Sequence, residues 1–375
     1  MKPAASSPAD GPSRRRFLQA SAAAVGAGAA AATLPAAAEA STAAHLDGLD
    51  RLILLGTAGG PPPEPTRAWI SSVLVVNGKV YVIDCGRSAV TQYMHAGLKY
   101  ADIKSIFLTH LHADHTCDYY NFFLLAGFGP DNDLNDGIVS PVDVYGPGPA
   151  GALPPRFGGG TAPTIDPAHP TPGLKQLTND AIDAFAYSSN VLMRDSHIPD
   201  VRTLIKPHEI AVPDAGARPL GPTAPPMKPF LVTDDGTVRV TAILVPHGVV
   251  FPSFAFRFDT PSGSVVFSGD TSRSENVVRL ARGADILVHE VIDIAFYKKS
   301  GYPPALLNHL EVSHTDVSAV GKIAQQAGVK TLVLTHLVPA TSSLVSPASW
   351  KQRAQQGFDG RVIVGADLQQ IPIAR

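Results

Sequence analysis

The chain has 375 residues, of which 45% are hydrophobic and 17% charged, the composition of a globular protein with a sizeable core. Its formal net charge of −2 lacks the strongly basic balance that nucleic-acid-binding proteins usually show. The two cysteines, Cys85 and Cys117, are too few for a disulfide framework or a cysteine-based zinc site. They are either two small core residues or one disulfide, and their spacing does not distinguish these alternatives.

The first forty residues differ in composition from the rest. Residues 13–19 read Ser-Arg-Arg-Arg-Phe-Leu-Gln and precede an alanine- and glycine-rich run from Ala20 to Ala32. This segment resembles a twin-arginine export signal with a cleavage site after Ala40; the alternative is a basic tail. The run is too short and too rich in alanine to predict a membrane span. The resemblance implies that the twin-arginine translocation machinery exports the folded protein to the periplasm or outside the cell, without residues 1–40 and without a stable membrane span.

Short apolar runs predict strands in the first part of the remaining domain, residues 41–375. Ser72–Val76 and Lys79–Asp84 flank Asn77-Gly78, a strong hairpin signal. A buried strand at Ser105–Thr109 leads directly into a histidine cluster. The other elements predicted in this part are a strand at Arg51–Leu55 and helices at Ser88–Leu98 and Thr116–Ala126.

Residues 127–235 break this pattern. The stretch is rich in proline and glycine, and it holds 13 acidic residues against 7 basic ones, a net charge of −6. A structureless loop of this length is unusual inside a compact domain. We therefore predict an inserted subdomain or lid at about 127–235, with islands of order such as Val142–Tyr145.

Regular patterning returns after residue 235. The predicted strands are Val238–Leu244, Ser253–Phe258, Ser264–Ser268, Ile286–Val288, Thr331–Leu334 and Arg361–Val364, and the predicted helices are Glu275–Ala281, Asp316–Gln326 and Pro347–Gln355. Early hairpins followed by alternating strands and helices indicate mixed α/β layers.

The densest chemical signal is the segment His110-Leu111-His112-Ala113-Asp114-His115. It places three imidazoles and one carboxylate within six residues, directly after a buried strand. These groups are ligands that suit zinc. His110 and His112 can face one ion while the following turn directs Asp114 and His115 elsewhere. The segment therefore predicts two nearby metal ions that share one loop.

This HxHxDH motif resembles that of the metallo-β-lactamase superfamily, whose later motifs follow in order over residues 51–370. The resemblance implies a four-layer αββα fold with the predicted insertion. It implies two zinc ions per chain, with Mn²⁺ or Fe²⁺ as alternatives. The ligands it implies are His110, His112 and His247 for one ion, Asp114, His115 and His336 for the other, and Asp270 as the bridge. Asp84 matches an aspartate that supports these ligands.

The segments Ser253–Phe258 and Ser268–Thr271 resemble the ribonuclease Z, arylsulfatase and phosphodiesterase-like branch of the superfamily. His289-Glu290 and His314-Thr315 carry the same resemblance. It implies that His314 donates a proton or stabilises an oxyanion and that Glu290 positions it. The residues that it makes catalytic are Asp114, Asp270, His314 and Glu290.

Two neighbouring histidines leave alternatives open. His309 competes with His314 for the catalytic role, and His314 is otherwise a helix cap. We expect His289 to be structural or to support a ligand.

From this site we predict a binuclear zinc hydrolase that uses a metal-bridging hydroxide to cleave small-molecule phosphodiester or sulfate esters. The alternatives are hydrolysis of a lactone, amide, carboxylate ester or aryl-halide bond, an iron-dependent oxidoreductase, and a non-catalytic binding protein. The acidic stretch 127–235 and the export signal argue against nucleic acid, because a polyanion would meet a repulsive field. The expected partner is therefore a small-molecule ester, the insertion would shape its pocket, and an oligomer is an open alternative.

Overall fold

The computed structural model of the protein describes residues 48–60, 62–126 and 136–374, and these belong to one compact unit. The predicted export signal lies outside the described residues. Within them, no helix has both the length and the apolar character that crossing a membrane requires.

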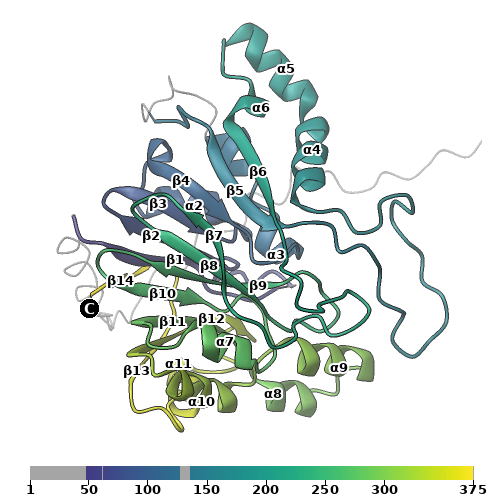
Figure 1. The fold of residues 1–375 in the computed structure, drawn as a ribbon, viewed down its shortest axis with the longest axis vertical. Helices are drawn as coiled ribbons and strands as arrows, with labels where there is room; N and C mark the ends of the chain where they lie inside the picture. The colour runs from purple at the N-terminus through teal and green to yellow at the C-terminus, as the bar shows by residue number, and fades with distance from the viewer. Residues whose placement is uncertain (1–47, 61, 127–135, 375) are drawn as a thin grey trace, which may run out of the picture. The chain divides into compact units, whose positions relative to one another are not determined.

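Two seven-stranded sheets form the centre of the unit (Figure 1). The first sheet has the order β14 (Gln369–Pro372), β1 (Arg51–Gly56), β2 (Ser71–Val76), β3 (Lys79–Ile83), β4 (Ile103–Phe107), β5 (Val142–Pro147) and β6 (Ile205–Ile210). The second has the order β13 (Arg361–Val364), β12 (Thr331–Val338), β11 (Ile286–Ile292), β10 (Ser264–Phe267), β9 (Phe254–Asp259), β8 (Arg239–Leu244) and β7 (Phe230–Asp234). Each sheet is antiparallel on one side and parallel on the other, with β3–β6 and β10–β13 parallel.

Helices are interspersed among the strands, and in chain order they are α2 (Ala89–His95), α3 (Ala113–Thr116), α4 (Leu174–Ala184), α5 (Ala186–Asp195), α6 (Val201–Leu204), α7 (Glu275–Leu280), α8 (Ile294–Lys299), α9 (Pro304–Ser313), α10 (Val317–Ala327) and α11 (Pro347–Ala354). A 3₁₀ turn covers Tyr100–Asp102. The helix predicted over 116–126 is instead the short α3 and a π-helical turn at Phe122–Ala126.

Alternating apolar residues explain the layering. Leu52 and Leu54 of β1 join the core between the two sheets, whereas Ile53 and Leu55 join a second core on the outer face of the first sheet. This period of two is what a strand buried on both faces requires. Helices α10 and α11 cover the outer face of the second sheet (Figure 1). The predicted four-layer αββα metallo-β-lactamase fold is thus confirmed.

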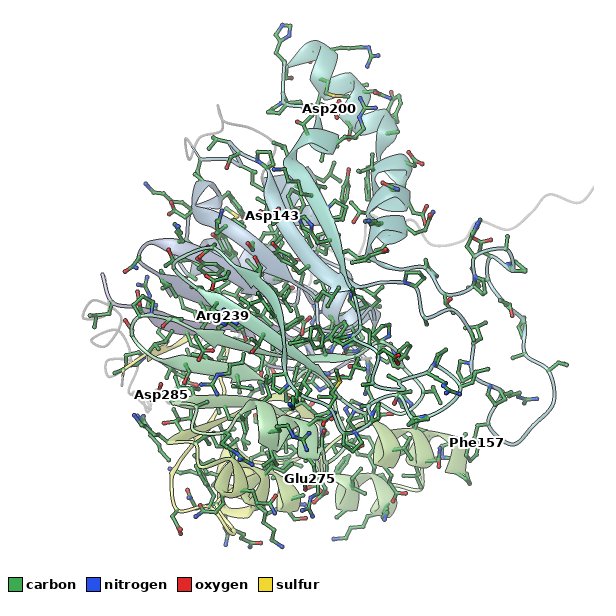
Figure 2. All side chains as sticks on the ribbon, viewed as in Figure 1. Asp143, Phe157, Asp200, Arg239, Glu275 and Asp285 are labelled. Atoms are coloured by element: carbon green, nitrogen blue, oxygen red, sulfur yellow. The ribbon has the colours of Figure 1, made fainter. Side chains whose placement is uncertain are left out.

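The stretch predicted as an insertion divides between the sheets and an arm. Three of its segments are the strands β5, β6 and β7, so these parts belong to the central sheets. In the chain, helices α4 to α6 come between β5 and β6. A long loop that carries Phe157 extends away from the sheets (Figures 1 and 2). The sequence indicated order at Val142–Tyr145, within β5, but it missed β6 and β7, because their apolar runs are short and Pro207 interrupts β6. Whether the rest forms a separate subdomain stays a prediction.

Candidate metal centre

The candidate site lies where strands of both sheets end. Asp84 follows β3 and His110 lies three residues beyond β4, while His247 and Asp270 each lie three residues beyond β8 and β10. His336 lies in the last part of β12. Side chains at the carboxyl ends of neighbouring strands meet at one edge of an α/β fold. Residues more than 200 positions apart therefore come together.

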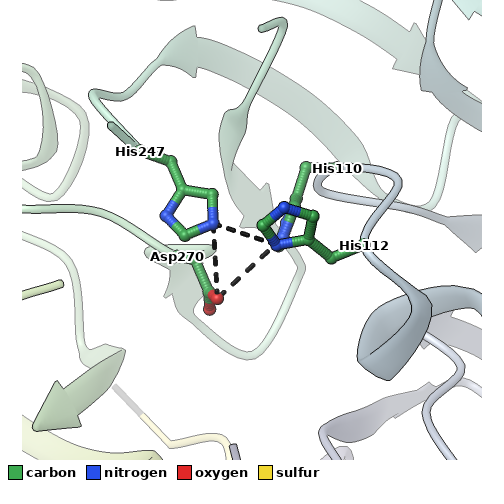
Figure 3. A group of neighbouring side chains, drawn as sticks. All are labelled: His110, His112, His247 and Asp270. Carbon is green, nitrogen blue, oxygen red and sulfur yellow. Dashed lines mark hydrogen bonds and ion pairs between the residues drawn. The ribbon is translucent and has the colours of Figure 1, made fainter. Parts of the chain in front are cut away.

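One group of side chains contains three histidines and one carboxylate. His110 and His112 from the loop after β4 and His247 from the loop after β8 converge on Asp270 (Figure 3). Nε2 of His110 and Nε2 of His247 lie 3.9 and 3.8 Å from Oδ2 of Asp270. Nε2 of His247 lies 3.2 Å from Nδ1 of His112. Ligand atoms around one tetrahedral zinc ion are about 3.3 Å apart, so this group has the spacing of a metal site.

A second group uses the same carboxylate. Nε2 of His115 and Nε2 of His336 lie 3.3 and 3.2 Å from Oδ2 of Asp270. Oδ2 of Asp114 lies 3.7 Å from the first of these nitrogens and 3.3 Å from the second. All four side chains are buried. The structure thus brings together all seven predicted ligands in two groups that share Asp270.

The unpartnered atoms of these groups fit a pair of cations. Nε2 of His110 and Nε2 of His115 are buried and have no hydrogen-bond partner among the described residues. Both point towards Asp270 Oδ2. A buried polar atom without a partner is costly, whereas a metal ion satisfies such a nitrogen. The donor set is therefore complete for two divalent ions.

The opposite ring nitrogens are held by other groups. Nδ1 of His115 lies 2.9 Å from Oδ2 of Asp84, and Nδ1 of His247 lies 2.9 Å from the carbonyl oxygen of Ser313. The backbone N–H of Thr109 in turn donates to Asp84. Such partners fix ring orientation and tautomer, which leaves the second nitrogen for the metal. The position predicted for Asp84 is therefore the one that the structure shows.

Burial and neighbouring charges set the protonation states. Burial, with the nearby histidines, holds the pKa of His110 well below its usual value. Burial also opposes ionisation of Asp270, but His336 and His115 outweigh it and hold the pKa of this carboxyl well below its usual value. Burial likewise opposes protonation of His115. Asp270, Asp84 and Asp114 outweigh this effect and raise the pKa of the ring well above its usual value. The site thus combines a neutral imidazole with carboxylates that stabilise positive charge.

A β-bulge directs His336 into the site. Glu290 of β11 pairs with Thr335 of β12 and Val291 pairs with Leu337, so His336 is the extra residue. Its φ of 45° lies in the left-handed region, which costs a non-glycine residue about 1 kcal/mol or more. A bulge changes the direction of one side chain without ending the strand. The strained backbone at the bulge therefore directs a candidate ligand, His336, into the site.

A glycine supports Asp114. The N–H of Gly60 donates to Oδ2 of Asp114 at 2.9 Å. A Cβ atom at Gly60 would lie 2.4 Å from the Cβ of Asp114, closer than two carbon atoms can pack. Gly60 had no assigned role from the sequence, although it ends a glycine-containing run that follows β1. Ser313 was also missed, since a backbone carbonyl gives no sequence signal.

His314 and Glu290 form a pair at the edge of the second group. Nδ1 of His314 lies 3.4 Å from Oε1 of Glu290 and 4.0 Å from Oδ2 of Asp270. Burial opposes protonation of the ring, but Glu290 and Asp270 outweigh it and raise the pKa of His314 to about 9. The N–H groups of Thr271 and Thr315 hold Oε1 of Glu290 in place. A histidine in this setting can carry a proton at neutral pH.

The other two histidines differ in position. His309 lies on α9 with its ring centre 6.4 Å from that of His247 and 6.1 Å from that of His314. It is half-buried and belongs to neither group of candidate ligands. His289 is buried on β11, and its Nδ1 lies 2.7 Å from the carbonyl oxygen of Glu290. Cys85 and Cys117 do not form a disulfide with each other.

Comparison with known families agrees with this architecture. The family described as beta-lactamase superfamily domain matches residues 191–337, and the family described as anti-Pycsar protein Apyc1 matches residues 51–127. A Mycobacterium bovis (strain BCG / Pasteur 1173P2) protein named ribonuclease Z is 30% identical over 332 residues, covering 86% of this chain and 98% of that protein.

Solved structures share the fold. The human tRNase Z short form has a TM-score of 0.57 at 23% identity, covering 87% of this chain and all of that one. The metallo-β-lactamase fold protein YhfI from Bacillus subtilis has a TM-score of 0.54 at 17% identity, covering 86% of this chain and 99% of that one.

These relatives overturn two predictions made from the sequence. We predicted a small-molecule phosphodiester or sulfate ester as substrate, and no nucleic acid as partner. The mycobacterial relative is named as a ribonuclease, and its match spans nearly its whole length. The prediction of a small-molecule ester, with its lactone, amide, aryl-halide and iron-oxidoreductase alternatives, is therefore wrong, and so is the exclusion of nucleic acid.

The net charge of the whole chain counts buried and surface carboxylates alike. Asp84, Asp114, Asp270 and Glu290 are all buried at the site. Without these four negative charges, the formal net charge of −2 becomes +2.

Acidic residues of the 127–235 stretch also have local partners. Asp143 on β5 lies 2.7 Å from His208, and Asp200 beside α6 pairs with Arg202 (Figure 2). These pairs do not remove the acidic excess, because Arg202 is already counted among the 7 basic residues. The exclusion failed because the charge of one stretch does not say which surface a substrate contacts.

Proposed function

The chain belongs to the ribonuclease Z family of the metallo-β-lactamase superfamily and is a metal-dependent hydrolase, and from this premise we propose that it hydrolyses phosphodiester bonds of RNA. The supporting relative is a ribonuclease by name, with 30% identity over nearly its full length. The observation within the molecule that carries the proposal is that one oxygen of Asp270 serves two adjacent groups of ligands.

The proposed metal content is two divalent ions. His110, His112 and His247 would hold one, Asp114, His115 and His336 the other, and Asp270 would bridge them. Imidazole and carboxylate ligands favour zinc, and Mn²⁺ or Fe²⁺ suit the same donors. When bound, such a pair supplies Lewis acidity and lowers the pKa of water, which favours displacement at phosphorus.

The protein's own part in the reaction would be to place a proton. A ribose oxygen that leaves phosphorus needs a proton, and general acids typically accelerate such steps by about 10²–10⁴-fold. Nδ1 of His314 faces Glu290, so its Nε2 would donate to the leaving oxygen. Glu290 would favour the charged ring and fix its orientation through its own bonds to Thr271 and Thr315.

The test combines metal analysis with RNA cleavage. The purified protein should contain about two zinc equivalents per chain and should cleave at least one substrate among an unstructured oligoribonucleotide, an RNA hairpin with a single-stranded extension and a tRNA precursor. Chelation should abolish cleavage and added zinc should restore it. Fully metal-loaded protein that leaves all three RNAs intact would overturn the proposal.

Substitutions separate the two ions. Asp270→Ala should lower the content of both metals, because its carboxylate serves both groups, whereas His112→Ala should mainly empty the first site. Asp166→Ala is the matched control, since Asp166 is an exposed aspartate far along the chain from every candidate ligand. Retention of both ions in the first variant would refute the bridging role of Asp270.

A further inference from the structure

A hollow of about 310 Å³ opens beside His112. This residue is the one candidate ligand among the seven that is partly exposed, while the others are buried. A substrate therefore reaches the site on the His112 side. The volume lies in the range of small-molecule binding pockets.

The walls of this hollow come from two loops. The loop after β5 supplies Leu153, and the loop between β8 and β9 supplies Val249 and Phe251. Leu111, next to His112 in the sequence, completes the inner end. Leu153 is 46% exposed and Val249 is 54% exposed, so both present apolar surface to whatever enters. No Asp, Glu, Lys or Arg lines this hollow in the part of the chain that the structure describes.

A second hollow of about 390 Å³ continues the first. Phe251, Pro252 and Gly148 line both, and the second hollow is also lined by Ile210, Val212 and one charged residue, Asp214. Phe251 thus belongs to the lining of both hollows, and it is partly buried against the core. We call the two hollows together the Phe251 groove.

We infer that the Phe251 groove binds the base of an unpaired nucleotide next to the phosphodiester bond that is cleaved. This inference rests on the proposed function and names the feature of RNA that the site would select. A nucleotide has an anionic phosphate and an uncharged aromatic base. The metal centre suits the first, and the part of the groove beside His112, which no charged residue lines among the described residues, suits the second.

The physical argument for an unpaired base is steric and energetic. A base inside a duplex has both faces covered by its neighbours and its edge occupied by its partner, so it cannot enter a groove. An unstacked base regains these contacts against an aromatic ring, and such stacking tolerates any base because every base has a π-face. The groove therefore favours cleavage where RNA is single-stranded.

The test is a cycle of two enzymes and two substrates. An RNA hairpin with a single-stranded extension is cleaved, its scissile bond is mapped, and each flanking nucleotide is then replaced by an abasic one. Loss of the base at one of these two positions should lower kcat/KM of the wild-type protein about tenfold or more. In Val249→Ser and in Phe251→Leu, removal of the same base should lower kcat/KM by about twofold or less, because the altered groove no longer distinguishes the normal substrate from the abasic one.

Matched controls lie on the arm. Val191 and Phe185 are 45% and 44% exposed on and before α5, outside the groove, so Val191→Ser and Phe185→Leu should keep the full effect of the base. A binding measurement adds a second reading: 2-aminopurine at the same position should change its fluorescence when wild-type protein binds in the presence of a chelator. The change should be reduced in Val249→Ser.

The two proposals fail differently. If the metal-loaded protein cleaves RNA but treats the normal and abasic substrates alike at both positions, the groove inference is wrong while the proposed function stands. If cleavage is as fast in a fully paired duplex as in the extension, the inference is also wrong. If no RNA is cleaved at all, the proposed function fails.

Discussion

His115 and His247 owe their orientation to partners outside the two ligand groups. Asp84 holds His115, and the carbonyl oxygen of Ser313 holds His247. Substitution of such a partner commonly weakens metal binding by about 10–100-fold, because the ligand ring is then free to turn. Residues that never touch the metal therefore belong to the function of the site.

His314→Ala should leave the metal content unchanged and lower the rate of RNA cleavage by about a hundredfold or more, because the leaving oxygen loses its proton donor. A substrate with sulfur in place of the leaving oxygen needs this proton less, so its rate should fall much less. The measurement is single-turnover cleavage of both substrates by metal-analysed protein. Equal losses on the two substrates would indicate that His314 only positions other groups.

Glu290→Gln should shift the alkaline limb of the pH–rate profile to lower pH. Glu290 helps raise the pKa of His314 to about 9, so removing its charge lowers that pKa. The protonated donor is then lost at a lower pH, and activity falls with it. Gln keeps an oxygen to accept the N–H groups of Thr271 and Thr315. Glu311→Gln, an exposed change on α9, is the control and should leave the limb in place.

At the scale of elements, strand ends rather than strand centres carry the chemistry. A bulge in β12 turns His336 into the site, and Asp84 after β3 also has a left-handed φ, of 57°. Both conformations are costly for residues other than glycine, and the packed sheets on either side hold them in place. The strands thus serve as rigid supports, and their irregular ends set the positions of the side chains.

Gly60→Ala should weaken metal binding at the second site while the protein stays folded. The new Cβ would collide with Asp114 and displace its carboxylate. Gly221→Ala is a suitable control, because its Cβ would make only ordinary contacts, 3.4 Å or more from Arg218. Zinc content and thermal unfolding should be measured together. Normal zinc content in Gly60→Ala would show that the loop adapts and that the contact does not matter.

At the scale of the whole molecule, the charge distribution reconciles a slightly acidic chain with an anionic substrate. The candidate site concentrates four carboxylates in the interior, and two divalent ions would neutralise them. The hollow beside His112, which is the first part of the Phe251 groove, has no charged side chain among its described lining residues. RNA would therefore meet a locally neutral surface, and its binding should depend less on salt than that of a protein with many phosphate contacts.

We also propose that the chain is exported through its N-terminal twin-arginine segment. This route carries folded cargo, so the metals would be loaded in the cytoplasm, and the protein would meet RNA in the periplasm or outside the cell. Replacement of both Arg14 and Arg15 by lysine should leave unprocessed, active protein in the cytoplasm, whereas Arg16→Lys should be processed normally. Cell fractionation with an RNA-cleavage assay measures this. Normal processing of the double variant would refute export by this route.

The sequence by itself determined the fold class and the seven side chains that meet at the site. Strand periodicity and the Asn77-Gly78 turn are local signals, and His110 to His115 lie in one short segment, so their meaning does not depend on distant residues. The resemblance to the metallo-β-lactamase superfamily named His247, Asp270 and His336, and each also follows or ends an apolar run. The substrate could not be predicted from the sequence in the same way, because the net charge of a segment does not say which surface a substrate contacts.

Only the tertiary structure decided which atoms face one another. The central place of Asp270 Oδ2, the bulge at His336 and the partners of His115 and His247 depend on the packing of two sheets. The Phe251 groove joins loops about a hundred residues apart, and its apolar lining residues Leu153, Val249 and Phe251 belong to no motif. Such features arise from the close packing of segments that are distant in the chain, and their contacts leave no periodic or local pattern in the sequence.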